Sequence, residues 1–149
     1  AFAIKNCNGK IPLEVKFHDE DLLILNKYKD NLDNIRSQID NQNINFYIDY
    51  IVNSLFEANK YFNDQEPWKK KDDIIRLNTI VYTTLEIVRK ISFLLYPIIP
   101  ESSLKALKIF DIEEKNIKLD SVSNNEYLTK GNNIHKIDIL FKKIEKNND

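Results

Sequence analysis

The sequence has few residues that break a helix or crosslink a chain. Its 149 residues include two glycines, four prolines, one cysteine and no methionine. So few helix breakers favour long helices. The two glycines, Gly9 and Gly131, stand alone, so the chain cannot contain a Walker loop, a dinucleotide-binding fingerprint or a nucleophile elbow. The enzyme classes that depend on these loops are therefore excluded.

The single cysteine and the two histidines also exclude sites. Cys7 cannot form an internal disulfide, which suits a reducing compartment and predicts a cytoplasmic protein. No base that would lower its pKa lies near it in sequence, so we expect an inert thiol rather than a reactive one. His18 and His135 are too far from Cys7 in sequence for zinc-ligand spacing. We predict no metal site and no catalytic residue in this chain.

Long apolar runs and an excess of one charge are absent as well. There is no run of about 18 apolar residues and no basic-then-apolar leader, so neither a membrane span nor a signal peptide is expected. Lysine and arginine total 22 against 23 acidic residues, a net charge of −1. Nucleic-acid binders usually carry a basic excess, so RNA binding here would depend on a local patch. Without a methionine, position 1 is expected to be a processed end or a cut within a longer chain.

Apolar residues instead recur at spacings of three and four, which predicts helices over about 19–40, 45–62 and 72–95. Residues 1–9 resemble the last turns of a helix that stops at Gly9, and Pro100 is expected to open a short helix. The predicted apolar stripes are Leu25, Tyr28, Leu32, Ile35 and Ile39; Tyr47, Ile51, Leu55, Ala58 and Phe62; and Ile74, Leu77, Val81, Leu85, Val88, Ile91 and Leu95.

Together these elements predict an all-α protein. Residues 1–110 are expected to form an antiparallel helical bundle. From residue 111 the periodicity weakens into short apolar pairs and polar turns. We therefore predict an irregular C-terminal tail over 111–149.

The only tryptophan lies at a polar junction between two predicted helices, in "NDQEPWKKKDD", residues 63–73. It could simply pack into the nearest groove. It could also be a platform on which an unpaired base stacks, which is worth about 1–3 kcal/mol per base. Lysines directly after the ring would then hold phosphates, although two aspartates follow and could serve only to open the next helix. The residues concerned are Trp68, Lys69, Lys70 and Lys71.

The surrounding stretch "EANKYFNDQEPWKKKDD", residues 57–73, resembles the signature of the anticodon-binding domain of the methionyl-tRNA synthetases, a class I aminoacyl-tRNA synthetase family. In that family an Ala-Asn-x-Tyr helix end leads through a short acidic loop into a Pro-Trp turn. Three further stretches agree in order and spacing. They are "NCNGKIP", "LLYPIIPESSLKAL" and "LTKGNNIHKIDILFKKIE".

The resemblance implies a non-catalytic domain that binds the anticodon loop of tRNA and recognises CAU. Trp68 takes the position that lies against the first anticodon base. The family's anticodon-reading Asn and Arg would fall before Ala1, outside this chain. The catalytic domain would also lie N-terminal to this chain. That domain would use ATP, and whether it also binds Mg or Zn stays open. The fragment itself is expected to need no cofactor.

Two further residues and the tail follow from the same resemblance. Asn59 and Tyr61 are candidates for shaping the anticodon pocket, with helix packing slightly favoured for Asn59. The tail is expected to pack on the bundle or toward the catalytic domain, with Lys142 and Lys143 replacing the family's Pro-Arg. Its apolar residues Ile139, Leu140 and Phe141 would then lack a partner in this chain.

A different class of function stays open beside this one. A helical protein–protein module would dock a partner helix on an apolar face. It would be indifferent to RNA, whereas phosphate binding would weaken steeply as salt rises.

Overall fold

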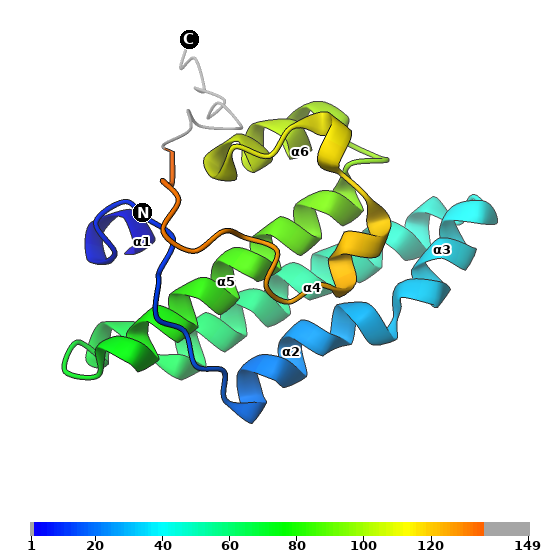
Figure 1. Cartoon of the computed structure of the whole chain (residues 1–149). Helices are drawn as coiled ribbons and strands as arrows, with labels where there is room; N and C mark the ends of the chain where they lie inside the picture. The colour runs from blue at the N-terminus through cyan, green and yellow to red at the C-terminus, as the bar shows by residue number, and fades with distance from the viewer. Residues whose placement is uncertain (1, 136–149) are drawn as a thin grey trace, which may run out of the picture.

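The computed structural model describes residues 2–135, and the regular secondary structure of these residues is helical, with no β-strand and one isolated bridge between Lys10 and Asn133. This confirms the all-α prediction. The elements are α1 (Phe2–Asn6), α2 (Asp19–Asp30), α3 (Leu32–Asp40), α4 (Ile44–Gln65), η1 (Pro67–Lys69), α5 (Ile74–Leu95), α6 (Pro100–Leu107), η2 (Lys108–Phe110), η3 (Glu114–Asn116) and η4 (Leu119–Ser123), where η marks a 3₁₀ turn (Figure 1).

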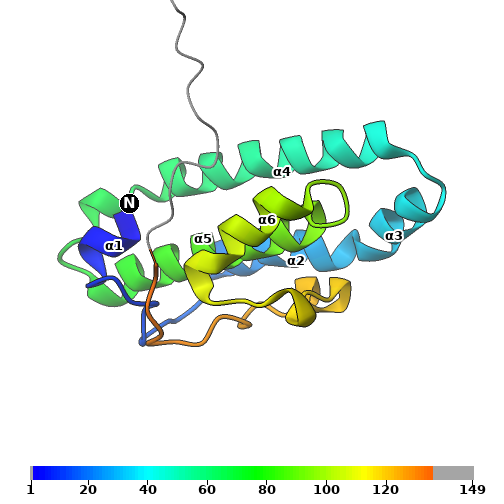
Figure 2. The ribbon, with the colours of Figure 1, turned by 90° about the horizontal axis from the view of Figure 1, so that it is seen from above.

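Helix α5 is the centre of the bundle. It runs antiparallel to α4, and both are 22 residues long. It also packs against α2, α6 and η4, so that other elements surround it (Figures 1 and 2). The loop from residue 66 to 73, which joins α4 to α5, lies at the same end of the bundle as α1 (Figure 1).

Because α5 is surrounded, its buried residues extend well beyond the predicted stripe. Leu77, Val81 and Ile91 are buried as expected, but Ile74 at the first turn of the helix is 56% exposed and Val88 is 36% exposed. The other faces of α5 bury polar and charged side chains. These are Arg76, Thr79, Thr83, Glu86, Arg89, Lys90 and Ser92.

The prediction of one helix over 19–40 was wrong at residue 31. The chain breaks there into α2 and α3, with Asn31 at φ −97° and ψ 0°. Its side-chain Nδ2 donates to the carbonyl oxygen of Lys27 at 2.8 Å. Asparagine commonly competes with helical backbone bonds in this way, and here the competition coincides with the break.

Of the other predicted helix boundaries, α4 runs three residues beyond the predicted end at 62 and α5 begins two residues after the predicted start at 72, whereas three expected end signals are confirmed. Gly9 has φ +67° and its N–H donates to the carbonyl of Ile4 at 3.0 Å, as in a left-handed helix stop. Acidic residues open α2, where they favour the helix N-terminus. Pro100 is the first residue of α6.

Residues 111–135 follow an irregular path over the bundle and contribute to its core. Val122 is fully buried and Leu128 is 4% exposed. Residues 131–134 then run beside residues 9–11. Ile11 N–H donates to the carbonyl of Asn132 at 2.7 Å, and Gly131 N–H donates to that of Ile11 at 2.8 Å. The predictions for Ile139, Leu140, Phe141, Lys142 and Lys143 concern residues outside the described part.

Candidate nucleic-acid interface

The junction between α4 and α5 is a tight turn with a strained residue at its start. Glu66 caps α4 at φ 47° and ψ 58°, in the left-handed region. That conformation is costly for a residue with a side chain, and the proline that follows disfavours helical conformations before it. Pro67 is buried and begins η1. The turn therefore projects Trp68 from a fixed backbone.

Trp68 packs at one edge and is exposed elsewhere. Its ring centroid lies 6.1 Å from that of Phe62 at an interplanar angle of 56°, and Phe62 in turn makes an edge contact with Phe2 at 5.6 Å. The residue is nevertheless 43% exposed. The packing interpretation is therefore observed, and the exposed part of the indole leaves surface on which a base could stack, so the platform role stays a prediction.

The three lysines after the ring differ in environment. Lys69 Nζ lies 3.1 Å from Glu66 Oε1 in a pair whose side chains are both exposed. Lys71 is exposed and Lys70 is half-buried. Exposed ion pairs contribute about 0–1 kcal/mol, so Lys69 can exchange Glu66 for a phosphate at little cost. Asp73 has a separate task, since its Oδ1 accepts from Arg76 N–H at 3.1 Å and caps α5.

A buried ion pair fixes the turn from below. Arg76 Nη1 and Nη2 donate to the two carboxylate oxygens of Asp21 at 2.7 and 3.1 Å, and Nη2 also donates to Gln65 Oε1 at 2.7 Å. Tyr61 Oη and His18 N–H donate to the same carboxylate at 2.5 and 2.8 Å. The group joins the start of α2, the end of α4 and the start of α5. We call Asp21, Tyr61, Gln65 and Arg76 the clamp.

The clamp keeps Asp21 ionised. Burial alone would raise the pKa of its carboxyl, but the hydrogen bonds from Arg76, Tyr61 and the His18 N–H outweigh burial and lower it. For Tyr61, burial and then the bond to Asp21 raise the pKa of the hydroxyl, so it remains a donor.

The structure separates the two pocket candidates predicted on α4. Tyr61 is 7% exposed and its hydroxyl is bound to Asp21. This position lets it support the turn through the clamp, but not touch a base directly. Asn59 is exposed and lines a hollow of about 320 Å³ with Phe2, Ala58 and Phe62. Its role as a pocket or packing residue stays a prediction.

Sequence reasoning missed the other members of the clamp. Asp21 looks like one of three acidic residues that open a helix, and Arg76 looks like an exposed charge in the first turn of the next. The only signal was indirect, since both lie in the first turn of a predicted helix. Periodicity cannot indicate that two first turns meet.

Cys7 is a half-buried free cysteine. Burial raises the pKa of the Cys7 thiol, which disfavours the reactive thiolate. Over residues 2–135, no group of three His, Cys, Asp or Glu side chains could hold a metal ion. Over the same residues, no helix has the length and apolar character needed to span a membrane.

Known proteins of one family are similar to this chain. The family model described as the anticodon-binding domain of methionyl tRNA ligase matches residues 11–149. The chain is 36% identical over 109 residues to a methionine–tRNA ligase of Brucella suis, covering 72% of this chain and 21% of that protein. It is 35% identical over 124 residues to the Mycobacterium leprae ligase, covering 80% and 23%. The chain thus spans about a fifth of the length of the curated relatives it matches.

A solved structure agrees in fold. Mycobacterium tuberculosis methionyl-tRNA synthetase bound by methionyl-adenylate superposes with a TM-score of 0.85 and 29% identity, covering 95% of this chain and 28% of that one. The free form of the same enzyme gives a TM-score of 0.81 over 90% of this chain.

Proposed function

The chain belongs to the family of methionyl-tRNA ligase anticodon-binding domains, and from this membership we propose that it recognises the CAU anticodon of a methionine tRNA. One observation carries the proposal. The only tryptophan of the chain is 43% exposed at a turn whose backbone the clamp fixes. A rigid, exposed indole beside flexible lysines is a suitable receptor for an unstacked base and its phosphates.

The proposed division of labour follows from the contacts. Trp68 stacks on the first anticodon base, and Lys69, Lys70 and Lys71 contact the phosphates that flank it. Asn59 offers an amide to a base edge from the neighbouring hollow. Asp21, Arg76 and Tyr61 act beneath the surface by holding the turn, since contacts to bases carry specificity only if their geometry is fixed.

We assign the chemistry of aminoacylation to a part of the enzyme that lies outside this chain. The full enzyme is proposed to join methionine to tRNA in the cytoplasm with ATP. Its catalytic domain would be a partner of the bundle within the full-length polypeptide. The described residues offer no metal-binding group, so any Mg or Zn is assigned to that domain as well. This chain supplies tRNA selection.

The direct test uses the fluorescence of Trp68. An anticodon stem-loop that carries CAU is titrated into the chain, and a stem-loop with a scrambled anticodon serves as the control. Because the chain has one tryptophan, any change in emission originates at this residue. We expect quenching by CAU that exceeds quenching by the scrambled loop.

The same titration in the full-length enzyme, run beside a Trp68→Phe variant so that the change in emission from Trp68 can be separated from that of any other tryptophan, decides the proposal. There the upstream helix is present, so the anticodon site is complete. A CAU loop that binds without altering Trp68 emission would contradict the stacking role. Binding that resists increasing salt would instead favour the protein–protein module, because phosphate contacts weaken steeply with ionic strength.

A further inference from the structure

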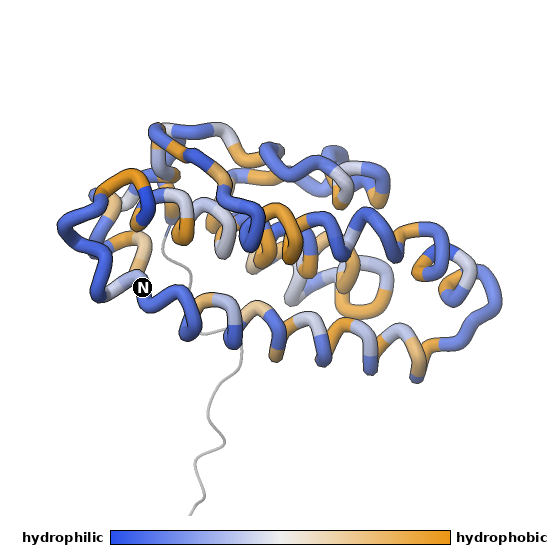
Figure 3. Tube along the Cα trace, turned by 90° about the horizontal axis from the view of Figure 1, so that it is seen from below, coloured by the Kyte–Doolittle hydropathy of each residue, from blue (hydrophilic) through white to orange (hydrophobic). Residues whose placement is uncertain are grey.

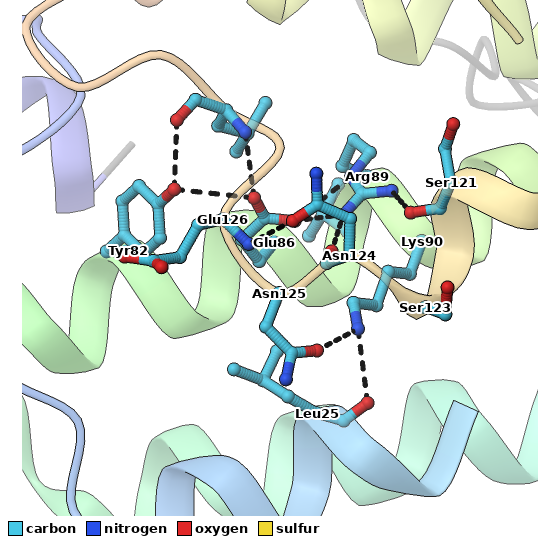
Figure 4. Close-up of polar contacts among 12 residues, drawn as sticks. Leu25, Tyr82, Glu86, Arg89, Lys90, Ser121, Ser123, Asn124, Asn125 and Glu126 are labelled. Atoms are coloured by element: carbon cyan, nitrogen blue, oxygen red, sulfur yellow. Dashed lines mark hydrogen bonds and ion pairs between the residues drawn. The ribbon is translucent and has the colours of Figure 1, made fainter. Parts of the chain in front are cut away.

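A second group of buried charges lies on α5, and Figure 4 shows its polar contacts. The side chains of Glu86, Arg89 and Lys90 are all 0% exposed. Residues 119–128, which comprise η4 and the five residues after it, lie across this part of α5. We call residues 119–128 the strap.

Glu86 and Arg89 bind the strap through its backbone. Glu86 Oε1 accepts from Leu128 N–H at 2.8 Å. Arg89 donates from Nη1 to the carbonyl of Ser121 at 2.7 Å and from Nη2 to that of Asn124 at 2.5 Å. Arg89 Nε also donates to Glu86 Oε2 at 3.0 Å, so the two charges neutralise each other. The strap is therefore fixed at three points along its length.

Lys90 reaches the strap with no carboxylate partner among residues 2–135. Its Nζ donates to the carbonyl of Leu25 on α2 at 3.1 Å and to Asn125 Oδ1 on the strap at 2.5 Å. Across the described residues, no carboxylate lies within 4.0 Å of this nitrogen. A neutral amine has two N–H donors and finds two acceptors here, whereas an ammonium has three donors. The site matches the neutral form of the side chain.

The other groups around Lys90 do not supply the missing counter-charge. On α5 the one carboxylate, Glu86, is paired with Arg89. From α2, Lys90 faces the ring of Tyr28, 5.8 Å from Nζ. From the strap, the Tyr127 ring lies against Arg89 at 4.6 Å, and Glu126 is paired with Lys130 at 3.1 Å. Burial first, and then the positive charge of Arg89, lower the pKa of Lys90, and the charge of Glu86 raises it only in part, so that the pKa lies at about 7.

We propose that the strap is a pH-sensitive latch, which closes over the neutral amine of Lys90 and opens when that amine takes up a proton. Opening exposes the nitrogen to water, where the ammonium is stable. The closed state binds fewer protons than the open state between the lowered pKa and the usual value of 10.5. Opening therefore becomes rarer as pH rises above about 7, and below that value it no longer responds to pH through this group.

Native-state hydrogen exchange of the full chain tests the latch. The reporter is the Leu128 amide, which exchanges only when its bond to Glu86 is released. After division by the intrinsic exchange rate, its opening constant should fall about tenfold per pH unit between pH 7.5 and 9.5, as expected for one proton. In Lys90→Met the constant should be independent of pH over this range. Lys29→Met, an exposed position on α2, should behave like the native chain.

Two results would overturn the latch. One is an equal pH dependence of the opening constant in the native chain and in Lys90→Met. The other comes from NMR of the native chain with labelled lysine, which also serves if the variant does not fold. A Lys90 side chain that titrates above pH 10 while the strap stays protected contradicts the proposal, and titration near pH 7 supports it.

Discussion

The molecule contains two buried ionic clusters with different charge balance. The clamp holds one carboxylate, Asp21, against one guanidinium, Arg76, and its remaining partners are neutral. The cluster under the strap holds one carboxylate, Glu86, against one guanidinium, Arg89, and adds the amine of Lys90, which has no carboxylate partner among the described residues. A balanced cluster can be both buried and ionised, so its geometry is constant around neutral pH. An unbalanced cluster makes its contacts conditional on a proton.

The largest effect should come from breaking the balanced cluster. Arg76→Met leaves the Asp21 carboxylate buried without its counter-charge, which typically costs about 3–5 kcal/mol of unfolding free energy. Urea denaturation at pH 7 measures the loss. Lys60→Met removes one side of the exposed pair with Asp64 and should cost less than about 1 kcal/mol. Equal losses in the two variants would show that the clamp is no more important than a surface pair.

Acid should weaken the clamp only at low pH. The pKa of Asp21 is lowered from its usual 3.8. Its contribution is therefore fully present above about pH 4 and is lost as pH falls through the lowered value.

The stability contributed by the cluster under the strap should change with pH above about 7 rather than in acid. Since the folded-state pKa of Lys90 is lowered to about 7, the unfolded chain binds the extra proton above that pH. Stability then rises with pH by about 1.4 kcal/mol per unit from this group. Urea midpoints of the native chain and Lys90→Met at pH 7.5, 8.2 and 9 give the difference. A constant difference would assign the whole pH response to other groups.

Trp68 at the turn should affect RNA binding. In the full-length enzyme, Trp68→Ala should weaken tRNA binding by about 1–3 kcal/mol and leave amino-acid activation unchanged. Phe56→Ala is the matched control, because Phe56 is an aromatic of α4 that is 69% exposed and belongs to no proposed contact. If activation falls while tRNA affinity holds, Trp68 is not a base platform.

The smallest expected effect concerns a single phosphate contact. Lys71→Ala should reduce the slope of log affinity against log salt by about one and weaken all sequences alike. Lys29→Ala removes an equally charged side chain on α2 and should leave the slope unchanged. A loss of CAU preference in Lys71→Ala would indicate a base contact instead.

The sequence predicted the fold better than it predicted burial. Periodicity located α4 and α5 and the stripe along α2 and α3, because one apolar face is enough to mark a helix. It could not show that α5 is surrounded. Along that helix Glu86, Arg89 and Lys90 look like a solvated face, and only the packing of residues far away in sequence buries them. The opposite case is α4, where apolar residues recur along a helix that lies at the edge of the bundle (Figure 3).

For the candidate site, too, the sequence predicted the position of the turn but not which side chains are buried. The motif in residues 57–73 located the Trp68 turn correctly between two helices. It grouped Asn59 with Tyr61, although two residues of helix are about 200° apart around the axis. The structure accordingly exposes Asn59 and buries Tyr61 in the clamp. Sequence proximity on a helix therefore does not place two side chains in one pocket.

The central position of α5 also has a consequence for biogenesis. Its charged side chains lose water only when α2 and the strap have both docked, and these lie about 65 residues before and 35 residues after Lys90 in sequence. Such non-local contacts form slowly. In a nascent chain that has emerged only as far as α6, one side of α5 would still be exposed to water. These side chains should therefore become fully buried only after residue 128 has left the ribosome, so the irregular segment after the bundle completes this part of the core.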